Sequence, residues 1–287
     1  MSQAITKIKS RIRSVTGAYK VTSAMKLVST SKLQSWKSKM IANKRYAEEV
    51  NNASASVFAH IDDVESALIN GNNNVNKNLY IIVTSSLGLC GAYNSNVFAL
   101  VDPLIKDEDD AIILGKKGRN YYRNAKFNKI TEFNSYESIK DASTIRAISD
   151  YMIRSYAEGK YKEVHLIYTE YLNPITFKAR DHVLLPFKND VDTTSEVGYG
   201  PLLEPSKEEL INTLIPFVVQ TLTYSKLLES EVSEQASRSN AMDNATENAE
   251  ELLDELHIEY NKARQASITQ EIVEIAAAAN ALYEEGE

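Results

Sequence analysis

Residues 217–285 read FVVQTLTYSKLLESEVSEQASRSNAMDNATENAEELLDELHIEYNKARQASITQEIVEIAAAANALYEE, and this stretch contains neither glycine nor proline. Residues 1–70 are similar, with no proline and only Gly17. Because glycine and proline disfavour helix interiors, both segments are predicted to be very long helices. Most of the remaining glycines and prolines fall within residues 71–205, which are therefore expected to form a compact middle between the two helices.

Both helical segments carry the spacing of a coiled coil. In the first, apolar residues recur every three to four positions over residues 5–19 and again over 33–68. In the last, they recur over residues 210–228 and 242–256. This repeat predicts that each helix packs along a seam against a partner helix.

The seam of the first helix lapses over residues 22–29. The seam positions there are polar, namely Thr22, Lys26 and Ser29. Met25, Leu27 and Val28 stand beside those positions, so the apolar stripe is expected to shift sideways. A lapse of this kind marks a local change of packing partner or pitch.

The two helical segments carry opposite charge. No aspartate or glutamate precedes Glu48, whereas the first 47 residues hold 11 lysines and arginines. From Glu204 onward there are 18 acidic residues and only five basic ones. Charge complementarity therefore favours pairing of the two helices within one chain.

A basic, acid-free helix is also what a nucleic-acid-binding coiled coil would show. That alternative stays open, but two features disfavour it. The basic residues are spread around the helix, and an apolar seam runs between them. The prediction is therefore that the chain binds no nucleic acid.

The middle of the chain alternates strand and helix patterns. Strands are expected at residues 79–83, 111–114 and 164–168, a helix at 143–158, and an edge strand at 183–187 that contains Pro186. Proline fits an edge strand better than a central one. The βαβ alternation predicts a small, mostly parallel sheet, entered through residues 70–78 and left through residues 189–205.

Two glycine-bearing turns invite a nucleotide-binding interpretation. Gly88-Leu89-Cys90-Gly91 follows the first strand, where phosphate-binding loops lie in such folds, but it lacks the G-x-G-x-x-G spacing. Gly115-Lys116-Lys117-Gly118 lacks the P-loop spacing and is expected to be a tight turn. A small nucleotide-binding enzyme of Rossmann type is therefore another open hypothesis. Because neither turn has the spacing of a nucleotide-binding motif, no nucleotide or other cofactor is predicted.

Catalytic and metal sites have no support in the sequence. The four histidines are scattered and form no metal-binding motif. The acidic run at residues 107–110 fits a solvated turn better than a cation site. Cys90, the single cysteine, excludes an internal disulfide and is expected to be a buried structural thiol. No apolar run is long enough for a transmembrane segment, and none resembles a signal peptide.

Several blocks resemble one known family, in chain order. They are IKSRIRSV at 8–15, VTSAMKLVS at 21–29, GLCGAYN at 88–94, SEQASR at 233–238, AMDNATENA at 241–249 and YNKARQASITQEIVEI at 260–275. Together they resemble the gamma subunit of the rotary (F-type) ATP synthase, bacterial type. The last block is long and specific, and the blocks span both ends of the chain and its middle.

The resemblance implies an α/β fold. It would comprise a long antiparallel coiled coil of the N- and C-terminal helices, over residues 1–70 and 206–287, and a small Rossmann-like, mostly parallel sheet domain over residues 71–205. It also implies a non-catalytic rotor shaft that couples proton- or sodium-driven rotation of the c-ring to the conformational cycle of the catalytic beta subunits. Its partners would be three alpha and three beta subunits, the epsilon subunit and the c-ring. The chain would lie at the cytoplasmic face of the bacterial plasma membrane, as a peripheral subunit.

The resemblance also assigns roles to individual residues. It implies that six residues contact beta subunits: Met25, Lys26, Cys90, Arg264, Gln265 and Thr269. It places Glu204 in the foot near the c-ring and the epsilon subunit.

The chain departs from the family pattern at three places. Ser86 and Leu87 replace the usual Asp-Arg before the Gly-Leu-Cys-Gly turn, which puts a charged contact with beta or epsilon in doubt. Pro201 and Leu203 stand where tyrosines are common, which puts c-ring contacts in doubt. Ala278-Ala279 replaces Gly-Ala near the tip and is expected to stiffen the last turns.

Overall fold

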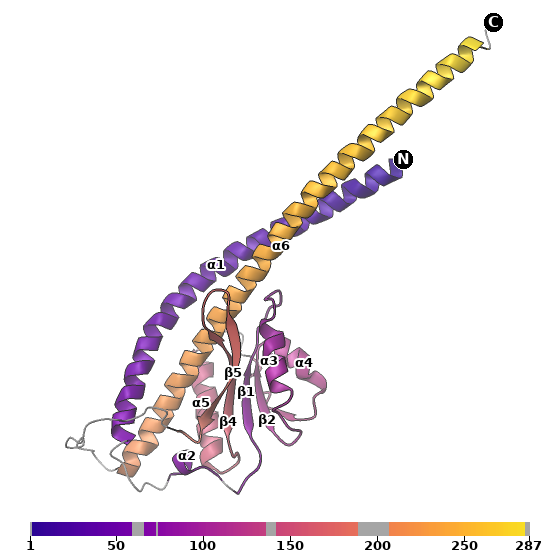
Figure 1. Ribbon diagram of the computed structural model, residues 1–287. Coiled ribbons are helices and arrows are strands. Elements are labelled where there is room, and N and C mark those ends of the chain that lie inside the picture. The colour runs from indigo at the N-terminus through magenta and orange to yellow at the C-terminus, as the bar shows by residue number, and fades with distance from the viewer. Residues whose placement is uncertain (1, 59–65, 73, 136–141, 189–206, 285–287) are drawn as a thin grey trace. The chain divides into compact units, whose positions relative to one another are not determined.

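A computed structural model describes residues 2–58, 66–72, 74–135, 142–188 and 207–284. Two helices dominate it, α1 (Ser2–Phe58) and α6 (Lys207–Glu284), drawn in indigo and in orange to yellow in Figure 1. α6 passes through Pro216 as one continuous helix. The two long helices expected from the lack of glycine and proline are thus present. Ile61 and Val64, expected at the end of the first seam, lie outside the described residues.

The chain divides into two compact units. One, here called the two-helix unit, comprises residues 1–28 and 239–287, and the other, the sheet unit, comprises residues 29–238. Both long helices contribute residues to each unit. The domain boundaries expected at residues 70 and 205 mark the ends of the helical segments and are not the boundaries of these two units. They stay a prediction.

The sheet has five strands in the order β3-β2-β1-β4-β5. The strands are β1 (Leu79–Val83), β2 (Asp110–Leu114), β3 (Asn128–Lys129), β4 (Val164–Tyr171) and β5 (Phe177–Leu185). β1 pairs in parallel with β2 and β4, and β2 with β3, whereas β5 runs antiparallel to β4 at one edge. The α/β fold with a mostly parallel sheet is therefore confirmed. The edge strand begins at residue 177, earlier than expected, and ends just before Pro186.

The helices of the sheet unit cover both faces of the sheet (Figure 1). They are α2 (Ala67–Asn70), α3 (Tyr93–Val101), α4 (Lys116–Tyr121), the 3-10 turn η1 (Tyr122–Asn124) and α5 (Ala142–Ala157). Alternate residues of β1 point to opposite faces, as a strand requires. Ile81 packs in the core formed with α5 and α6, and Ile82 in the core formed with α3. Because both faces are covered, β1 and β2 are buried along their whole length.

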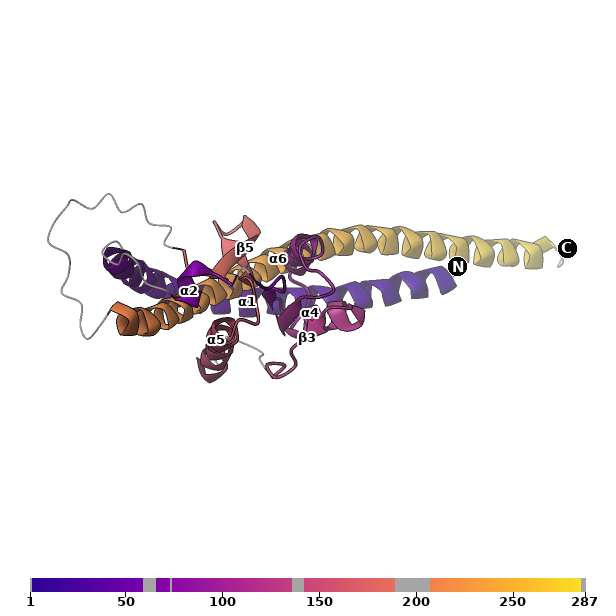
Figure 2. The same cartoon turned by 90° about the horizontal axis from the view of Figure 1, so that it is seen from below.

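Within the sheet unit, α1 lies beside α6, as Figure 2 also shows from below. Trp36, only 5% exposed, joins the core that includes Leu227 and Leu228 of α6. In the two-helix unit, residue 22 meets residue 246 and residue 26 meets residue 243, so the helices run antiparallel there. The expected antiparallel pairing of the terminal helices is confirmed in that unit.

The seam lapse over residues 22–29 differs from the expectation. Leu27 and Val28 are 68% and 54% exposed, so the apolar stripe does not shift onto them. The polar residues keep the seam instead, since Thr22 accepts a hydrogen bond from Thr246 at 2.9 Å and Ser29 is buried. Paired side chains allow polar groups to occupy a helix interface that apolar residues would otherwise fill.

The acidic run at residues 107–110 is the expected solvated turn only in its first half, because Asp107 and Glu108 are exposed whereas Asp109 and Asp110 are buried. Asp109 is fully buried and accepts backbone N–H groups of Asn78 and Lys106, each at 2.8 Å. Asp110 is paired with Lys77 at 2.7 Å and accepts the hydroxyl of Tyr161 at 2.8 Å. Buried carboxylates persist when every oxygen finds a donor, which explains why this turn is structural. Among the described residues, no cluster of three potential metal ligands occurs.

Candidate functional site

The turn after β1 is closed by its own side chains. Ser85 donates its backbone N–H to Asn94 Oδ1 at 3.0 Å, and Asn94 Nδ2 donates to Ser85 Oγ at 2.7 Å. Ser85 Oγ donates in turn to the carbonyl of Leu87 at 2.6 Å. Leu89 adopts a φ of 60°, a left-handed conformation that a bulky residue rarely takes. This small network fixes the turn as a rigid feature rather than a loose loop.

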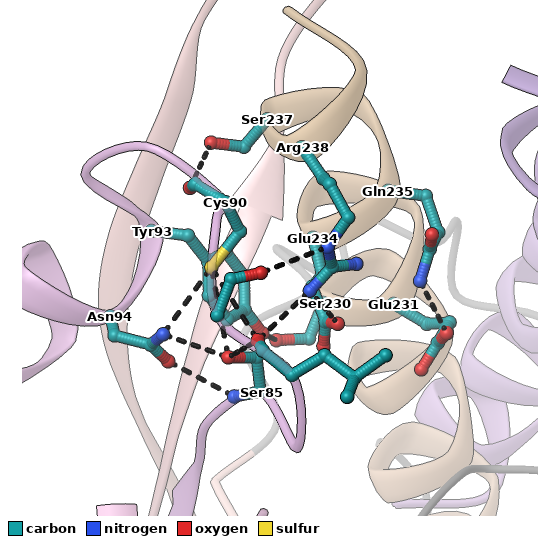
Figure 3. A network of polar contacts seen from close by, with 12 residues as sticks. Ser85, Cys90, Tyr93, Asn94, Ser230, Glu231, Glu234, Gln235, Ser237 and Arg238 are labelled. Carbon is teal, nitrogen blue, oxygen red and sulfur yellow. Dashed lines mark hydrogen bonds and ion pairs between the residues drawn. The ribbon is translucent and has the colours of Figure 1, made fainter. Parts of the chain in front are cut away.

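Helix α6 forms hydrogen bonds with the same turn, as Figure 3 shows. Ser237 Oγ donates to the carbonyl of Cys90 at 2.7 Å. Arg238 Nη2 donates to the carbonyl of Leu87 at 3.0 Å, and its Nε to the carbonyl of Gly88 at 3.3 Å. We call this set of contacts between residues 85–94 and α6 the clamp.

Serines of α6 extend these contacts into the sheet. Ser230 Oγ lies 2.8 Å from the hydroxyl of Tyr93 and accepts the backbone N–H of Thr169 at 3.2 Å. Ser233 Oγ donates to the carbonyl of Thr169 at 3.1 Å. Their small side chains let α6 lie close against β4 and α3, so the helix is bonded to the sheet and not merely packed on it.

A buried ion pair completes the clamp. Arg238 is 4% exposed, and its Nη2 lies 2.7 Å from Glu234 Oε1. Burial, and then the negative charge of Glu231, raise the pKa of Glu234 to about 7, although Arg238 opposes that rise. The carboxyl of Glu234 is therefore poised to gain or lose its proton near neutral pH.

The polarity of the turn argues against nucleotide binding. A phosphate loop points N–H groups at its anion. Here the carbonyls of Leu87, Gly88 and Cys90 face α6, and a guanidinium and a hydroxyl already occupy them. The Cys90 side chain is 3% exposed, and burial raises the pKa of its thiol. The expected buried structural thiol is confirmed, and such a thiol is unreactive.

The same turn presents two apolar side chains outward. Leu87 and Leu89 are 64% and 61% exposed. A partner meeting this turn would therefore touch the leucines, because the Cys90 thiol points inward.

The other candidate contacts lie in the two-helix unit. Lys26 forms an ion pair with Asp243 across the two helices, and this hydrogen bond raises the pKa of Lys26. Met25 is half-buried next to it. The exposed residues Arg264, Gln265 and Thr269 lie together on one stretch of α6. Glu204, Pro201 and Leu203 lie outside the described residues.

Comparison with known proteins decides the family. A family model described as ATP synthase matches residues 4–282. The chain is 35% identical to the ATP synthase gamma chain of Mesoplasma florum over 279 residues, which cover 97% of this chain and 98% of that one. It is 36% identical to the gamma chain of Desulfitobacterium hafniense, over 96% and 98% of the two chains. The chain belongs to the ATP synthase gamma chain family.

Solved structures agree on the fold. A chain of the Euglena gracilis mitochondrial ATP synthase, from a structure of OSCP, F1 and the c-ring, matches with a TM-score of 0.68 at 16% identity over 100% of this chain and 97% of that one. A chain of the Tetrahymena thermophila mitochondrial ATP synthase, from a central stalk and c-ring structure, matches with a TM-score of 0.57 at 25% identity over 78% of this chain and 99% of that one. No described helix of this gamma-family chain is both long and apolar enough to cross a membrane.

Sequence reasoning did not find the residues that make the clamp. Arg238 is a polar interruption of the last seam, as are Glu231 and Gln235, and Glu234 is named only within the block at 233–238 that resembles the family. The available signal was the run of small and polar residues at helical spacing over residues 230–238, which is typical of a helix face that meets backbone rather than another apolar stripe. The turn residues that Ser237 and Arg238 contact lie 147 and 151 positions away in the chain, so these contacts are visible only in the fold.

Proposed function

We propose that this chain is the central-stalk rotor shaft of a proton- or sodium-translocating ATP synthase. Its likeness to gamma chains along nearly its whole length carries the proposal. In this role the c-ring turns the shaft, and the asymmetric shaft takes the catalytic beta subunits through different conformations. The chain itself would be non-catalytic.

The proposed partners follow from this role. They are three alpha and three beta subunits around the terminal helices, with the epsilon subunit and the c-ring at the foot. Long helices with many exposed apolar residues are what an enclosed shaft needs, and Ile268, Ile272 and Ile275 are 49%, 60% and 70% exposed. The shaft would be peripheral to the membrane, on its cytoplasmic face in a bacterium.

The proposed contacts with beta subunits fall in three places. Arg264, Gln265 and Thr269 offer polar groups on an exposed stretch of α6. The turn around Cys90 offers Leu87 and Leu89 instead of the thiol. Met25 and Lys26 offer a third contact on α1, and Glu204 is proposed as a foot contact near the c-ring.

The contact at Lys26 would be an exchange of partners. Its ammonium group is already paired with Asp243, and both side chains are about 40% exposed. A half-exposed ion pair contributes little to stability, because water screens the two charges. An acidic segment of a passing subunit could therefore compete for Lys26 at small cost.

The clamp gives the proposed shaft a route for torque. A force on the sheet of the sheet unit would reach α6 through several hydrogen bonds, at positions 230 to 238. α6 continues from there without a break to residue 284. A coupling made of many short contacts resists rotation better than a single flexible connection.

The deciding experiment reconstitutes the full chain with matching alpha and beta subunits and measures ATP hydrolysis. We expect activity only when the chain is present, in one large complex. Arg264→Ala should lower turnover severalfold, while thermal unfolding of the chain changes by less than about 0.5 kcal/mol, as for other exposed substitutions.

Lys262→Ala is the matched control, since Lys262 is another exposed cation two positions away on the same helix. It should leave turnover unchanged. Normal turnover with Arg264→Ala would remove the role of Arg264, and failure of the native chain to assemble would remove the rotor proposal itself.

A further inference from the structure

A small cavity lies beyond the carboxyl end of β3, next to the carboxyl-terminal half of β2, in the sheet unit. Its volume is about 230 Å³. Ile113 near the end of β2 and Ile130 just after β3 form its apolar wall. The two strands are parallel, with Ala111 opposite Lys129, so β3 ends beside the start of β2 and the cavity lies beyond that end, against the rest of β2.

The polar lining of the cavity is cationic. Among the residues that the structure describes, it consists of Arg119, Arg123, Lys129, Thr131 and Asn134, with no aspartate or glutamate. Arg119 is half-buried and reaches it from α4, and Lys129 is half-buried at the end of β3. Three cations converge here in a chain whose net charge is -7.

The partners of these cations are neutral: oxygens for all three, and for Lys129 also the ring of Phe127, whose centroid lies 5.4 Å from its Nζ. Arg119 Nη1 lies 3.4 Å from the carbonyl of Ile113, at the edge of hydrogen-bond range. Arg123 donates to Asn120 Oδ1 at 3.2 Å, and Lys129 donates to the carbonyl of Ala125. Within the described part of the chain, none of the three forms an ion pair with a carboxylate, whereas the neighbouring Lys126 pairs with Asp107 at 3.5 Å. Among the described residues, the positive charge at this cavity therefore has no carboxylate partner.

We propose that this cavity binds a small phosphate-type oxyanion. Arginine presents a planar fork that matches two oxygens of a phosphate, and lysine adds a point charge. Sites for drug-sized ligands occupy about 300–1,000 Å³, so a cavity of about 230 Å³ suits inorganic phosphate better than a whole nucleotide. The turn after β1 directs the carbonyls of Leu87 and Gly88 to Arg238, so it is less suited to an anion than this cavity is. The inference does not depend on the rotor proposal.

The test uses the purified full chain and inorganic phosphate, added at constant ionic strength against chloride. A ligand that binds only the folded state raises the unfolding temperature in a saturable way. We expect that rise for the native chain, and an apparent affinity about tenfold weaker or more for Arg123→Gln, because one charge-assisted hydrogen bond supplies a factor of that size. Arg123 is exposed and bonds only Asn120 in the described structure, so this variant should fold.

Two further variants complete the design. Arg119→Gln should weaken binding as Arg123→Gln does. Lys126→Gln should respond to phosphate as the native chain does, since Lys126 is 81% exposed and does not line the cavity. An equal phosphate effect in all variants would be a general salt effect and would overturn the proposal. Stabilisation by a hexa-aspartate peptide through Arg123, with no response to phosphate, would overturn it as well and would mark a docking site for an acidic segment.

Discussion

At the scale of single residues, Arg238 decides how the turn after β1 is held. Its guanidinium bonds two turn carbonyls and the carboxylate of Glu234, and it is 4% exposed. A buried ion pair is retained only when its remaining hydrogen-bonding groups are also satisfied. Arg238 meets that condition by bonding the carbonyls, whereas burial raises the pKa of Glu234.

The raised pKa of Glu234 makes stability depend on pH. The folded chain holds this proton up to a pH of about 7, whereas the unfolded chain releases it near 4.5. Between these values the folded state binds more protons, so stability is greatest below about 4.5 and is lost as the pH rises through about 7. Glu234→Gln should remove roughly 3 kcal/mol of this loss. Thermal or urea unfolding of the full chain at pH 5, 6, 7 and 8 measures it.

Glu250→Gln is the control for that measurement, because Glu250 is an exposed acid on the same helix. It should leave the pH dependence as it is in the native chain. If stability depends on pH in the same way for the native chain and for Glu234→Gln, the prediction is wrong. The positive charges of Arg238 and Lys32, which both lower the pKa of Glu234, would then offset its burial.

At the scale of elements, the sequence predicts what local pattern determines. β1 and β2 were predictable because each is a short apolar run buried on both faces. β3 was not, since a strand of two residues, Asn128 and Lys129, has no periodicity to detect. The place of Thr22 in the seam is not predictable, because one segment of sequence alone does not show that the partner helix supplies Thr246 as its hydrogen-bond partner.

The contacts of the clamp cannot be predicted from local sequence patterns either, because their partners lie elsewhere in the chain. The small serines of α6 are informative only once β4 and the turn after β1 are known to lie against them. The resemblance to a family supplied candidate contacts at Arg264 and Thr269, which no local pattern would single out among the exposed polar residues of α6.

The contact of α4 with β1 yields a prediction about two glycines. A Cβ on Gly118 would lie 2.6 Å from Thr84 Oγ1 and 2.8 Å from Ile113 Cγ2, so α4 would have to move away from the sheet. Gly118→Ala should destabilise the chain by about 1–3 kcal/mol. Gly17→Ala should instead stabilise it by about 0.5–1 kcal/mol, because Gly17 lies inside α1 with nothing within 4 Å of the added atom. Urea unfolding compares them, and the same sign for both would contradict the packing described for α4.

At the scale of the whole molecule, the end of α6 has apolar side chains without a core of its own. Leu256 is the last buried residue among those whose burial the structure describes. Beyond it, residues 257–279 are exposed or half-buried, and Ile272, Val273 and Ile275 are each more than half exposed. This pattern is typical of a surface that becomes buried in an assembly, and the proposed shaft would bury it inside the ring of alpha and beta subunits.

That burial leads to a prediction in which stability and assembly separate. Ile272→Glu combined with Ile275→Glu should leave the unfolding temperature of the chain nearly unchanged, because neither side chain is buried in it. Binding to alpha and beta subunits should weaken tenfold or more, since each isoleucine buried in the ring contributes about 1.5–3 kcal/mol. Size-exclusion chromatography of the reconstituted complex, with ATP hydrolysis of the same fractions, measures both. Glu271→Gln is the control, because Glu271 is an exposed polar residue next to Ile272. This variant should assemble normally. Equal assembly of the double variant would mean that the end of α6 is not enclosed, and the exposed isoleucines would then need another partner.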